Sequence, residues 1–226
     1  MPLAAWIPRQ LKNWQNIVKS NIDYTLYLVT DRELMYASRI EDCVERAIMG
    51  GCTVIQLREK TVSSREFYET AMKVRDVTTR YGVPLIINDR ADIALAVNAD
   101  GLHIGQSDLP YKEARRILGQ DKIIGISVSN LMEAGEAVNL GADYLGITMF
   151  ATDTKTNTEL TSIDELRRIR TKCRVPIVVI GGINKKTIPL FAGIGIDGIA
   201  VVSAIVSQKD ETAAANELKL LFKKIK

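Results

Sequence analysis

The sequence is poor in the residues on which several common kinds of site depend. It has a single histidine, His103, so it cannot form a histidine-rich metal site, and a Ser-His-Asp triad would depend on that residue alone. Its three cysteines are an odd number without CxxC spacing, and Cys52 lies in an apolar run, so we expect reduced and buried thiols. No apolar run approaches the roughly 18 residues of a membrane span. Histidine-based chemistry, disulfide bonding and membrane insertion are therefore disfavoured.

The chain also lacks an excess of charge of one sign. Its 30 lysines and arginines are mixed with 27 aspartates and glutamates, without the clustered basic excess that binding to nucleic acid or anionic membranes needs. Only six prolines and no biased tract occur among 46% hydrophobic and 25% charged residues, which excludes disordered and fibrous chains. Residues 1–14 place their cations after a short apolar stretch, the wrong order for a secretory signal. We expect a cytoplasmic globular protein that binds small molecules at a local site, without nucleic-acid or membrane partners.

Short apolar runs rich in β-branched residues recur along the chain and leave room for a helix between one run and the next. Eight such runs, with no break in composition, predict a (β/α)8 TIM barrel of the α/β class. Doubly wound sheets, the rival architecture, usually have about five or six strands. The expected strands are Tyr24–Val29, Cys52–Leu57, Pro84–Ile87, Gly101–Ile104, Lys122–Ile126, Asp143–Ile147, Pro176–Ile180 and Gly198–Val202.

Start and end signals mark the helices between these strands. Two capping boxes, in which Ser63 is followed by Glu66 and Ser162 by Glu165, indicate the beginnings of two helices. Several helices end in a glycine or an asparagine just before the next strand, and these residues tolerate the left-handed conformation of a helix cap. The endings of this kind lie in residues 50–52, 98–101, 141–143 and 195–198.

Both ends of the chain are expected to be helical. Residues 9–20 are amphipathic and precede the first strand, so we divide the chain into an N-terminal helical extension (1–23) and a catalytic barrel (24–226). We expect the extension to cover the N-terminal end of the barrel. The last helix is expected over residues 210–226, with an inward face of Ala214, Leu218, Leu221 and Ile225.

Polar side chains gather where the second and third expected strands end. Reactive groups of a (β/α)8 barrel lie at the C-terminal ends of its strands. Alternation along the second strand sends Gln56, Arg58 and Lys60 to one side, so two cations and an amide face one point. The third strand ends in Asn88 and Asp89. The alternative interpretation is a solvated strand end with ordinary surface charges.

Asp89 and Asp108 place two carboxylates at the ends of adjacent strands. Hard oxygen ligands beside an arginine and a lysine suit Mg²⁺ that is shared with a phosphate-bearing substrate. The alternative for both residues is helix N-capping, because each precedes a helix and aspartate favours that position. Capping is a strong alternative for Asp108, which stands before Leu109 and Pro110.

A second phosphate site is expected at the ends of the sixth to eighth strands. The sixth strand runs into a polar loop, residues 152–157, although a plain solvated turn has the same composition. Gly181 and Gly182 let backbone N–H groups approach a ligand, and a short helix after the eighth strand points its positive end inward. His103 should face inward, as a polar lining group rather than a general base. Two phosphate sites indicate an enzyme that joins or cleaves two phosphorylated small molecules.

Seven short motifs follow one another from Tyr24 to about Ser207. They are Leu28–Asp31, Gln56–Lys60, Ile87–Arg90, Asp100–Gln106, Thr152–Lys155, Ile180–Ile183 and Val201–Ile205. In order and spacing, this series resembles the thiamine-phosphate synthase family. Seven collinear motifs are far more specific than any one of them.

The resemblance implies a transferase that joins 4-amino-5-hydroxymethyl-2-methylpyrimidine diphosphate to 4-methyl-5-(2-hydroxyethyl)thiazole phosphate, giving thiamine monophosphate and pyrophosphate. It also implies a Mg²⁺ cofactor held by Asp89 and Asp108. The positions implied for the pyrimidine diphosphate are Gln56, Arg58, Lys60, Asn88, Ser127 and Lys155. Among these, the catalytic ones are expected to be Arg58, Lys60, Ser127 and Lys155. Those implied for the thiazole phosphate are Thr152, Thr154, Gly182, Val202 and Ser203.

Two departures from the family pattern concern the sixth loop and the fifth strand. Residues 146–152 lack the Gly-Pro and the second proline usual in the family and are one residue shorter. Ser129 replaces a histidine that resembles the catalytic group of a related thiazole tautomerase, which weakens the tautomerase alternative. A non-catalytic phosphate-binding barrel should have lost charged ligands, and none is lost. An aldolase usually needs a lysine inside a strand, and no expected strand interior offers one.

Overall fold

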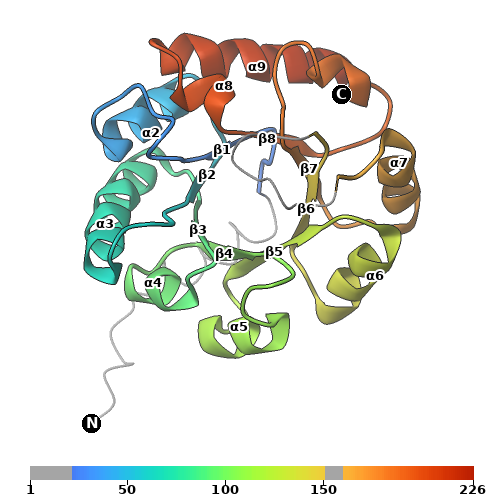
Figure 1. The fold of residues 1–226 in the computed structure, drawn as a ribbon, viewed down its shortest axis with the longest axis horizontal. Helices are drawn as coiled ribbons and strands as arrows, with labels where there is room; N and C mark the ends of the chain where they lie inside the picture. The colour runs from blue at the N-terminus through green and yellow to red at the C-terminus, as the bar shows by residue number, and fades with distance from the viewer. Residues whose placement is uncertain (1–21, 151–159) are drawn as a thin grey trace.

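The computed structural model describes residues 22–150 and 160–226, which form a closed barrel of parallel strands surrounded by helices (Figure 1). Each strand pairs with the next in sequence, and β8 pairs with β1, which closes the ring. The predicted (β/α)8 barrel is confirmed, and every strand begins and ends within two residues of its predicted bounds. The strands in these ranges are β1 (Leu26–Val29), β2 (Val54–Leu57), β3 (Leu85–Asn88), β4 (Gly101–Ile104), β5 (Ile123–Val128), β6 (Tyr144–Thr148), β7 (Ile177–Ile180) and β8 (Gly198–Val201).

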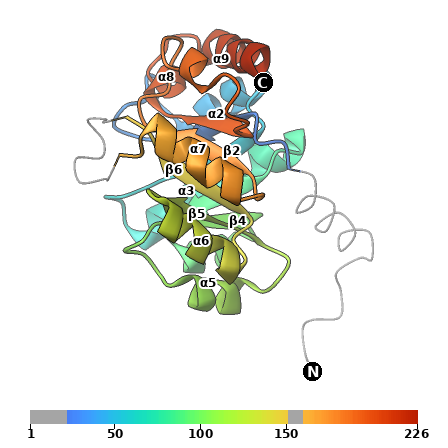
Figure 2. The same ribbon diagram turned by 90° about the vertical axis from the view of Figure 1, so that its right-hand side faces the viewer.

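Helices lie outside the strands and alternate with them around the ring (Figures 1 and 2). Both predicted helix starts are confirmed, with Ser63 and Ser162 as the N-cap residues. The Ser63 hydroxyl accepts a hydrogen bond from the Glu66 N–H (3.2 Å), and the Ser162 hydroxyl accepts one from the Glu165 N–H (3.1 Å). The described helices are α2 (Ile40–Met49), α3 (Ser64–Tyr81), α4 (Ala91–Ala96), α5 (Tyr111–Leu118), α6 (Leu131–Leu140), α7 (Ile163–Lys172), the 3-10 helix η2 (Ile188–Phe191), α8 (Ser203–Val206) and α9 (Glu211–Ile225).

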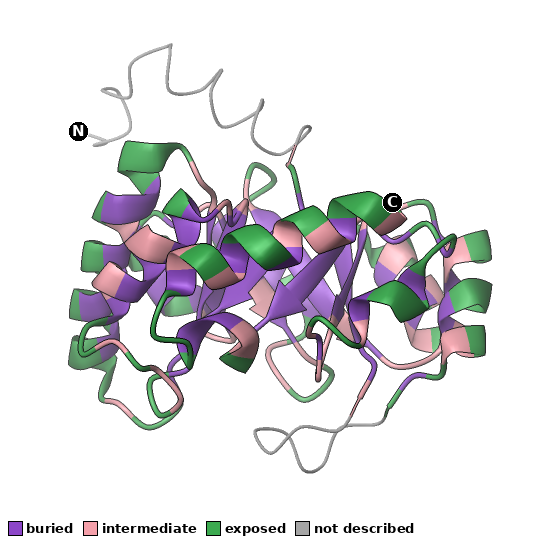
Figure 3. Cartoon of the chain, turned by 90° about the horizontal axis from the view of Figure 1, so that it is seen from above, coloured by how far each residue is buried: buried purple, intermediate pink, exposed green. Residues whose placement is uncertain are grey.

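Apolar side chains fill two spaces, one inside the barrel and one between the barrel and its helices. The inner space holds tyrosines as well as aliphatic residues, among them Tyr24, Tyr27 and Tyr144. In Figure 3 the strands are almost entirely buried, while the helices carry exposed residues on their outward faces. A parallel strand that is covered on both sides has no polar face. This burial explains why the strand runs in the sequence are continuously apolar.

The helix endings follow the prediction. At the end of α2, Gly51 takes a positive φ of 110°, while Gly50 has a φ of −74°. Gly141 (94°), Asn98 (50°) and Gly195 (82°) are left-handed as expected.

The predicted inward face of α9 is confirmed at Leu218 but wrong by one position at Ala214 and Leu221. The helix buries Glu211, Ala215, Leu218 and Phe222, whereas Ala214, Leu221 and Ile225 are only half-buried. The reason is an ion pair at the start of the helix. The carboxylate of Glu211 is 1% exposed and accepts hydrogen bonds from the guanidinium of Arg46 in α2, at 2.8 and 3.1 Å. This pair fixes the rotation of α9 about its axis, and an apolar pattern does not reveal that a glutamate faces inward.

Aspartates that precede β4, β6 and β8 tie the N-terminal end of the barrel together. The carboxylate of Asp143, before β6, accepts hydrogen bonds from Arg115 of α5 (2.7 Å) and from the backbone N–H of Ile124 in β5 (2.8 Å). One side chain therefore joins a helix and two neighbouring strands. The same arrangement recurs for Asp100 with Arg75 and the Leu85 N–H, and for Asp197 with Arg170 and the Ile177 N–H.

The predicted helix over residues 9–20 lies outside the described residues, so the N-terminal extension remains a prediction. Cys43, Cys52 and Cys173 are free and buried, as expected from their spacing. None of the helices in the described ranges is long and apolar enough to cross a membrane.

Candidate active site

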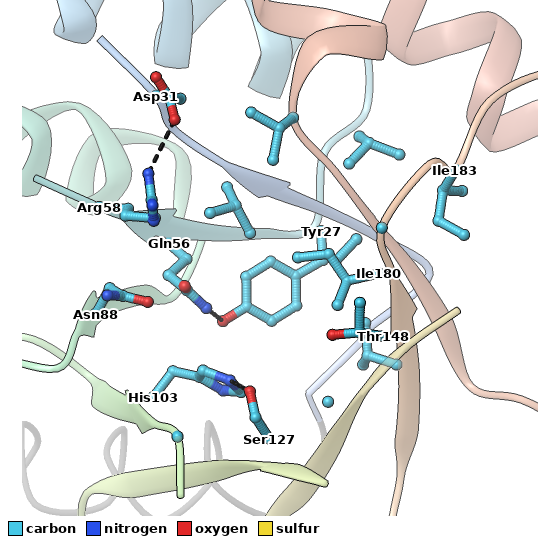
Figure 4. Close-up of a pocket in the computed structure, with 18 of the residues that line it drawn as sticks. Tyr27, Asp31, Gln56, Arg58, Asn88, His103, Ser127, Thr148, Ile180 and Ile183 are labelled. Carbon is cyan, nitrogen blue, oxygen red and sulfur yellow. Dashed lines mark hydrogen bonds and ion pairs between the residues drawn. The ribbon is translucent and has the colours of Figure 1, made fainter. Parts of the chain in front are cut away.

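A cavity of about 1070 Å³ lies at the C-terminal ends of the strands (Figure 4). Side chains or backbone from every strand, or from the loop that follows it, contribute to its lining. The predicted site residues that the structure describes all line this cavity: Gln56, Arg58, Lys60, Asn88, Asp89, Asp108, Ser127, Gly182, Val202 and Ser203. The other predicted site residues, Thr152, Thr154 and Lys155, lie outside the described residues.

The cationic side chains after β2 reach the cavity, as the alternation predicted. A guanidinium nitrogen of Arg58 donates to Asp31 at 2.8 Å (Figure 4). The Arg58 backbone N–H donates to the Thr30 hydroxyl at 3.0 Å. Asp31 is 8% exposed, so the pair is shielded from bulk water and holds the guanidinium in one orientation. Lys60, further along the loop, forms an ion pair with Asp89.

A third ion pair involves the residues next to Asp31 and Arg58 in the sequence. Arg32 donates to Glu59 at 2.7 Å, and the side chain of Glu59 is only 2% exposed. Residues 31 and 32 thus pair with residues 58 and 59, which joins the loop after β1 to the loop after β2. The two ion pairs therefore hold the loop after β2 in place against the loop after β1.

Asp89 and Asp108 are close enough to influence each other. Burial and the neighbouring Asp89 carboxyl raise the pKa of Asp108, although a hydrogen bond of 2.7 Å from the Gly105 N–H opposes the shift. The N-cap residues of the helices that follow are Arg90 for α4 and Pro110 for α5, and neither helix has a side-chain cap. The capping alternative is therefore wrong for both aspartates.

The two carboxylates have the properties of a Mg²⁺ site that is completed by a substrate. Mg²⁺ in proteins commonly uses one or two carboxylates, phosphate oxygens and water. No cluster of three or more histidine, cysteine, aspartate or glutamate side chains able to hold a metal occurs in residues 22–150 and 160–226. The donor set fits a shared site rather than a cage made only of protein.

A row of hydrogen bonds crosses the floor of the cavity. The Gln56 amide nitrogen donates to the Tyr27 hydroxyl (2.9 Å), which lies 2.7 Å from the Tyr144 hydroxyl. Tyr144 in turn contacts Nδ1 of His103 at 2.9 Å. Nε2 of His103 contacts the Ser127 hydroxyl at 2.9 Å (Figure 4). His103 therefore faces inward and lines the cavity, as expected.

The opposite wall, after β7, is built from glycines and aliphatic residues. Gly181 and Gly182 have φ of 86° and 63°, which favours glycine. A Cβ atom on Gly182 would lie 2.8 Å from the Cβ of Phe150, so space as well as backbone conformation requires glycine there. Ile180 and Ile183 flank the pair and make this side of the cavity apolar (Figure 4).

Comparison with known proteins identifies the family of this chain. The family model described as thiamine monophosphate synthase matches residues 26–205. The chain belongs to the thiamine-phosphate synthase family. The relatives of known name include the thiamine-phosphate synthases of Clostridium beijerinckii (56% identical over 209 residues, 92% of this chain and 100% of the relative) and of Clostridium botulinum (54% over 209 residues, 92% and 98%).

A solved structure of the thiamine phosphate pyrophosphorylase of Pyrococcus furiosus is similar throughout. It superposes with a TM-score of 0.82 at 38% identity, over 90% of this chain and 98% of that chain. The predicted resemblance, fold and reaction are thereby confirmed. The protein is a transferase of the thiamine-phosphate synthase family that acts on small molecules and condenses a pyrimidine and a thiazole moiety into thiamine monophosphate.

Sequence reasoning did not identify three residues whose hydrogen bonds shape the cavity. Asp31 stands in the first of the seven motifs, but nothing in the sequence pairs it with Arg58. Tyr27 and Tyr144 lie within apolar runs, where a tyrosine is ordinarily a core residue. Their position in the sequence carried no signal that their hydroxyls meet inside the barrel.

Proposed function

We propose that the cavity catalyses a Mg²⁺-dependent substitution with a dissociative character. The bond between the methylene carbon and the diphosphate oxygen of the pyrimidine substrate breaks, and its electron pair leaves with pyrophosphate. The ring nitrogen of the thiazole phosphate gives its lone pair to that carbon, which forms the new C–N bond of thiamine monophosphate. The observation that carries the proposal is the convergence of Arg58, Lys60, Asp89 and Asp108 on one cavity.

The two substrates are assigned to opposite sides of this cavity. The pyrimidine diphosphate side comprises Gln56, Arg58, Lys60, Asn88 and Ser127, and the thiazole phosphate side comprises Gly182, Val202 and Ser203. On the family resemblance alone, Lys155 is assigned to the pyrimidine diphosphate, and Thr152 and Thr154 are assigned to the thiazole phosphate. The apolar surface of Ile180 and Ile183 beside Gly182 suits a thiazole ring, and a glycine backbone suits the approach of its phosphate.

Arg58 and Lys60 supply fixed positive charge where the leaving group becomes more negative. Such preorganised charge stabilises the transition state more than the ground state. Mg²⁺, held by Asp89 and Asp108, would supply further positive charge to the diphosphate oxygens. With a diphosphate of roughly −3, the cations Mg²⁺, Arg58, Lys60 and Lys155, and the carboxylates of Asp31, Asp89 and Asp108, the site has a net charge of roughly −1. The diphosphate is thus almost neutralised before it departs.

The reaction needs no general base at the bond-forming atom. The attacking thiazole nitrogen carries a lone pair and has no proton to lose. A chain with a single histidine is adequate for this chemistry, and the ring nitrogens of His103 already contact Tyr144 and Ser127. The electron-rich aminopyrimidine ring would stabilise the positive charge that develops on its methylene carbon.

Incubation of the purified protein with both substrates tests the proposal. We expect equimolar thiamine monophosphate and pyrophosphate with Mg²⁺, no product when either substrate is omitted, and loss of product when the metal is chelated. Product formation that is unchanged by chelation would contradict the Mg²⁺ assignment. Turnover of the thiazole phosphate alone would instead support a tautomerase.

We also propose that the protein acts in the cytoplasm and that residues 24–226 form its catalytic domain. The free and buried state of all three cysteines is consistent with a reducing compartment. The cavity residues that the structure describes lie within residues 27–208. Removal of residues 1–21 should leave kcat/KM within about twofold of the full-length value, because every proposed site residue belongs to the barrel domain.

A further inference from the structure

One continuous row of hydrogen bonds joins five side chains on the cavity floor, in the order Gln56, Tyr27, Tyr144, His103 and Ser127. Its two ends, Gln56 and Ser127, are proposed substrate-binding residues on β2 and β5, while its middle lies deeper in the barrel. Tyr27 and Tyr144 are each only 1% exposed. The buried tyrosines therefore connect two parts of the site that do not touch each other.

Glycines provide the space for this row of hydrogen-bonded side chains. In the barrel register, Gly125 of β5 lies between His103 of β4 and Tyr144 of β6. A Cβ atom on Gly125 would lie 2.1 Å from the Tyr144 ring, and one on Gly146 would lie 2.9 Å from the His103 ring. The two rings stack with centroids 5.5 Å apart because no side chain separates them.

Each hydrogen bond of this row can be assigned a direction if every group in it is to keep a partner. With the Gln56 amide nitrogen as donor to Tyr27, the acceptor that the described residues offer to the Tyr27 proton is the Tyr144 oxygen. The same assignment directs the Tyr144 proton to Nδ1 of His103. A neutral imidazole that accepts at Nδ1 carries its proton on Nε2, which donates to the Ser127 oxygen.

This direction determines what Ser127 offers to a substrate. In this assignment its oxygen accepts from His103, which leaves its own proton for another acceptor, and Ser127 lines the cavity. Burial raises the pKa of both Tyr27 and Tyr144, so their phenol groups remain protonated donors at physiological pH.

We infer that Tyr27 and Tyr144 are positioning residues of the pyrimidine diphosphate subsite, which act by fixing the hydrogen-bond direction at Ser127 and the orientation of the Gln56 amide. Neither tyrosine acts on the substrate directly; each works through the two terminal residues. The inference rests on the proposed assignment of Gln56 and Ser127 to the pyrimidine diphosphate.

Removal of either hydroxyl tests the inference. Tyr144→Phe and Tyr27→Phe keep the aromatic ring and interrupt the row of hydrogen bonds at different points. Each should lower kcat/KM for the pyrimidine diphosphate by about tenfold, the effect of one lost hydrogen bond, and leave KM for the thiazole phosphate unchanged. Melting temperatures identify any variant that fails to fold, and two independent variants protect the test against that outcome.

Tyr24→Phe is the matched control. Tyr24 belongs to the same aromatic cluster, with its ring 5.0 Å from that of Tyr144, and is 6% exposed. Within the described ranges its hydroxyl has no hydrogen-bond partner, and it does not line the cavity. Its removal should leave both kinetic constants unchanged.

A double-mutant cycle separates a positioning role from a structural one. If Tyr144 acts through Ser127, the variant carrying both Tyr144→Phe and Ser127→Ala should be no worse than Ser127→Ala alone. Lys60 does not belong to the row of hydrogen bonds. The variant carrying both Tyr144→Phe and Lys60→Met should therefore lose kcat/KM by the product of the two single losses.

Multiplied losses with Ser127→Ala, or an equal loss in Tyr24→Phe, would overturn the inference while leaving the proposed function intact. Ser127→Ala and Gln56→Ala variants with wild-type kcat/KM would overturn the subsite assignment and the inference together. Failure of the wild-type protein to form thiamine monophosphate would overturn the proposed function itself.

Discussion

Asp89 combines an uncommon backbone conformation with a place among charged groups. Its φ of 62° lies in the left-handed region, where a residue other than glycine is disfavoured by about 1–2 kcal/mol. Aspartate and asparagine tolerate this conformation better than most residues, because their short polar side chains can form local hydrogen bonds. A strained residue that contacts Lys60 and faces Asp108 is consistent with a functional need for its carboxylate.

The substitution Asp89→Asn should therefore separate function from folding. Asparagine keeps the side-chain size and tolerates the positive φ, so the melting temperature should change little. Loss of the negative charge should lower kcat/KM by about 10² or more and weaken the response to Mg²⁺. The measurements are thermal unfolding and the dependence of the initial rate on Mg²⁺ concentration.

Asp89→Ala is the matched comparison, because it removes the same charge without the tolerance for positive φ. It should lose similar activity and, in addition, about 1 kcal/mol of stability. An Asp89→Asn variant that retains the wild-type response to Mg²⁺ would refute the metal assignment at this residue.

Lys60 is expected to act on the departure of the diphosphate more than on its binding. Lys60→Met should lower kcat/KM by about 10²–10³, the usual loss for one preorganised electrostatic donor, with most of the loss in kcat. Arg90→Met is the control: Arg90 follows Asp89 in the chain but pairs with Asp92 at 2.6 Å and does not line the cavity. A Lys60→Met effect confined to KM would mean that the lysine binds ground and transition states equally.

Among the elements of the barrel, the aspartates before β4, β6 and β8 have a role that is distinct from the site. Each joins an arginine of an odd-numbered helix to the first part of an odd-numbered strand. Thr53 takes the corresponding position before β2, where its hydroxyl accepts from the Leu26 N–H at 3.1 Å. These contacts lie at the N-terminal ends of the strands, opposite the cavity, where interactions in this fold serve stability.

Asp143→Ala should consequently destabilise the protein without changing its chemistry. The substitution leaves Arg115, whose side chain is 10% exposed, without its carboxylate, and we expect a loss of about 3 kcal/mol in the free energy of unfolding. Asp164→Ala is the control, because the Asp164 side chain is 89% exposed and its loss should cost no more than about 0.5 kcal/mol. Denaturant unfolding measures both. A reduced kcat per folded Asp143→Ala molecule would show that the contacts of Asp143 also affect the geometry of the active site.

Helix α9 illustrates where element prediction from sequence reaches its limit. Its start at Asp210 was predictable, because an aspartate at this position caps the Ala213 N–H at 2.9 Å. Its inward face was not, because the decisive residue is Glu211, a charged side chain that is buried only in the company of Arg46. Apolar periodicity shows which faces avoid water but not which charges are paired.

For the molecule as a whole, local patterns predicted much of the architecture and of the site. The strands were predictable because a strand covered on both sides needs a continuous apolar run. Gln56, Arg58 and Lys60 were predictable because alternation and barrel closure send them to one point. The hydrogen bonds on the cavity floor were not predictable from the sequence. The hydroxyls of Tyr27 and Tyr144 come from residues 117 positions apart and meet only when the barrel closes.

The central claim is that the Arg58, Lys60, Asp89 and Asp108 end of the cavity binds the pyrimidine diphosphate together with Mg²⁺. Calorimetric titration of the full-length protein with this substrate, in the presence of Mg²⁺ or a chelator, tests the claim most directly. Binding should weaken by at least about tenfold without the metal, and the Asp89→Asn variant should lose this dependence. A protein that binds the thiazole phosphate but shows no Mg²⁺-dependent binding of the pyrimidine diphosphate would contradict the account.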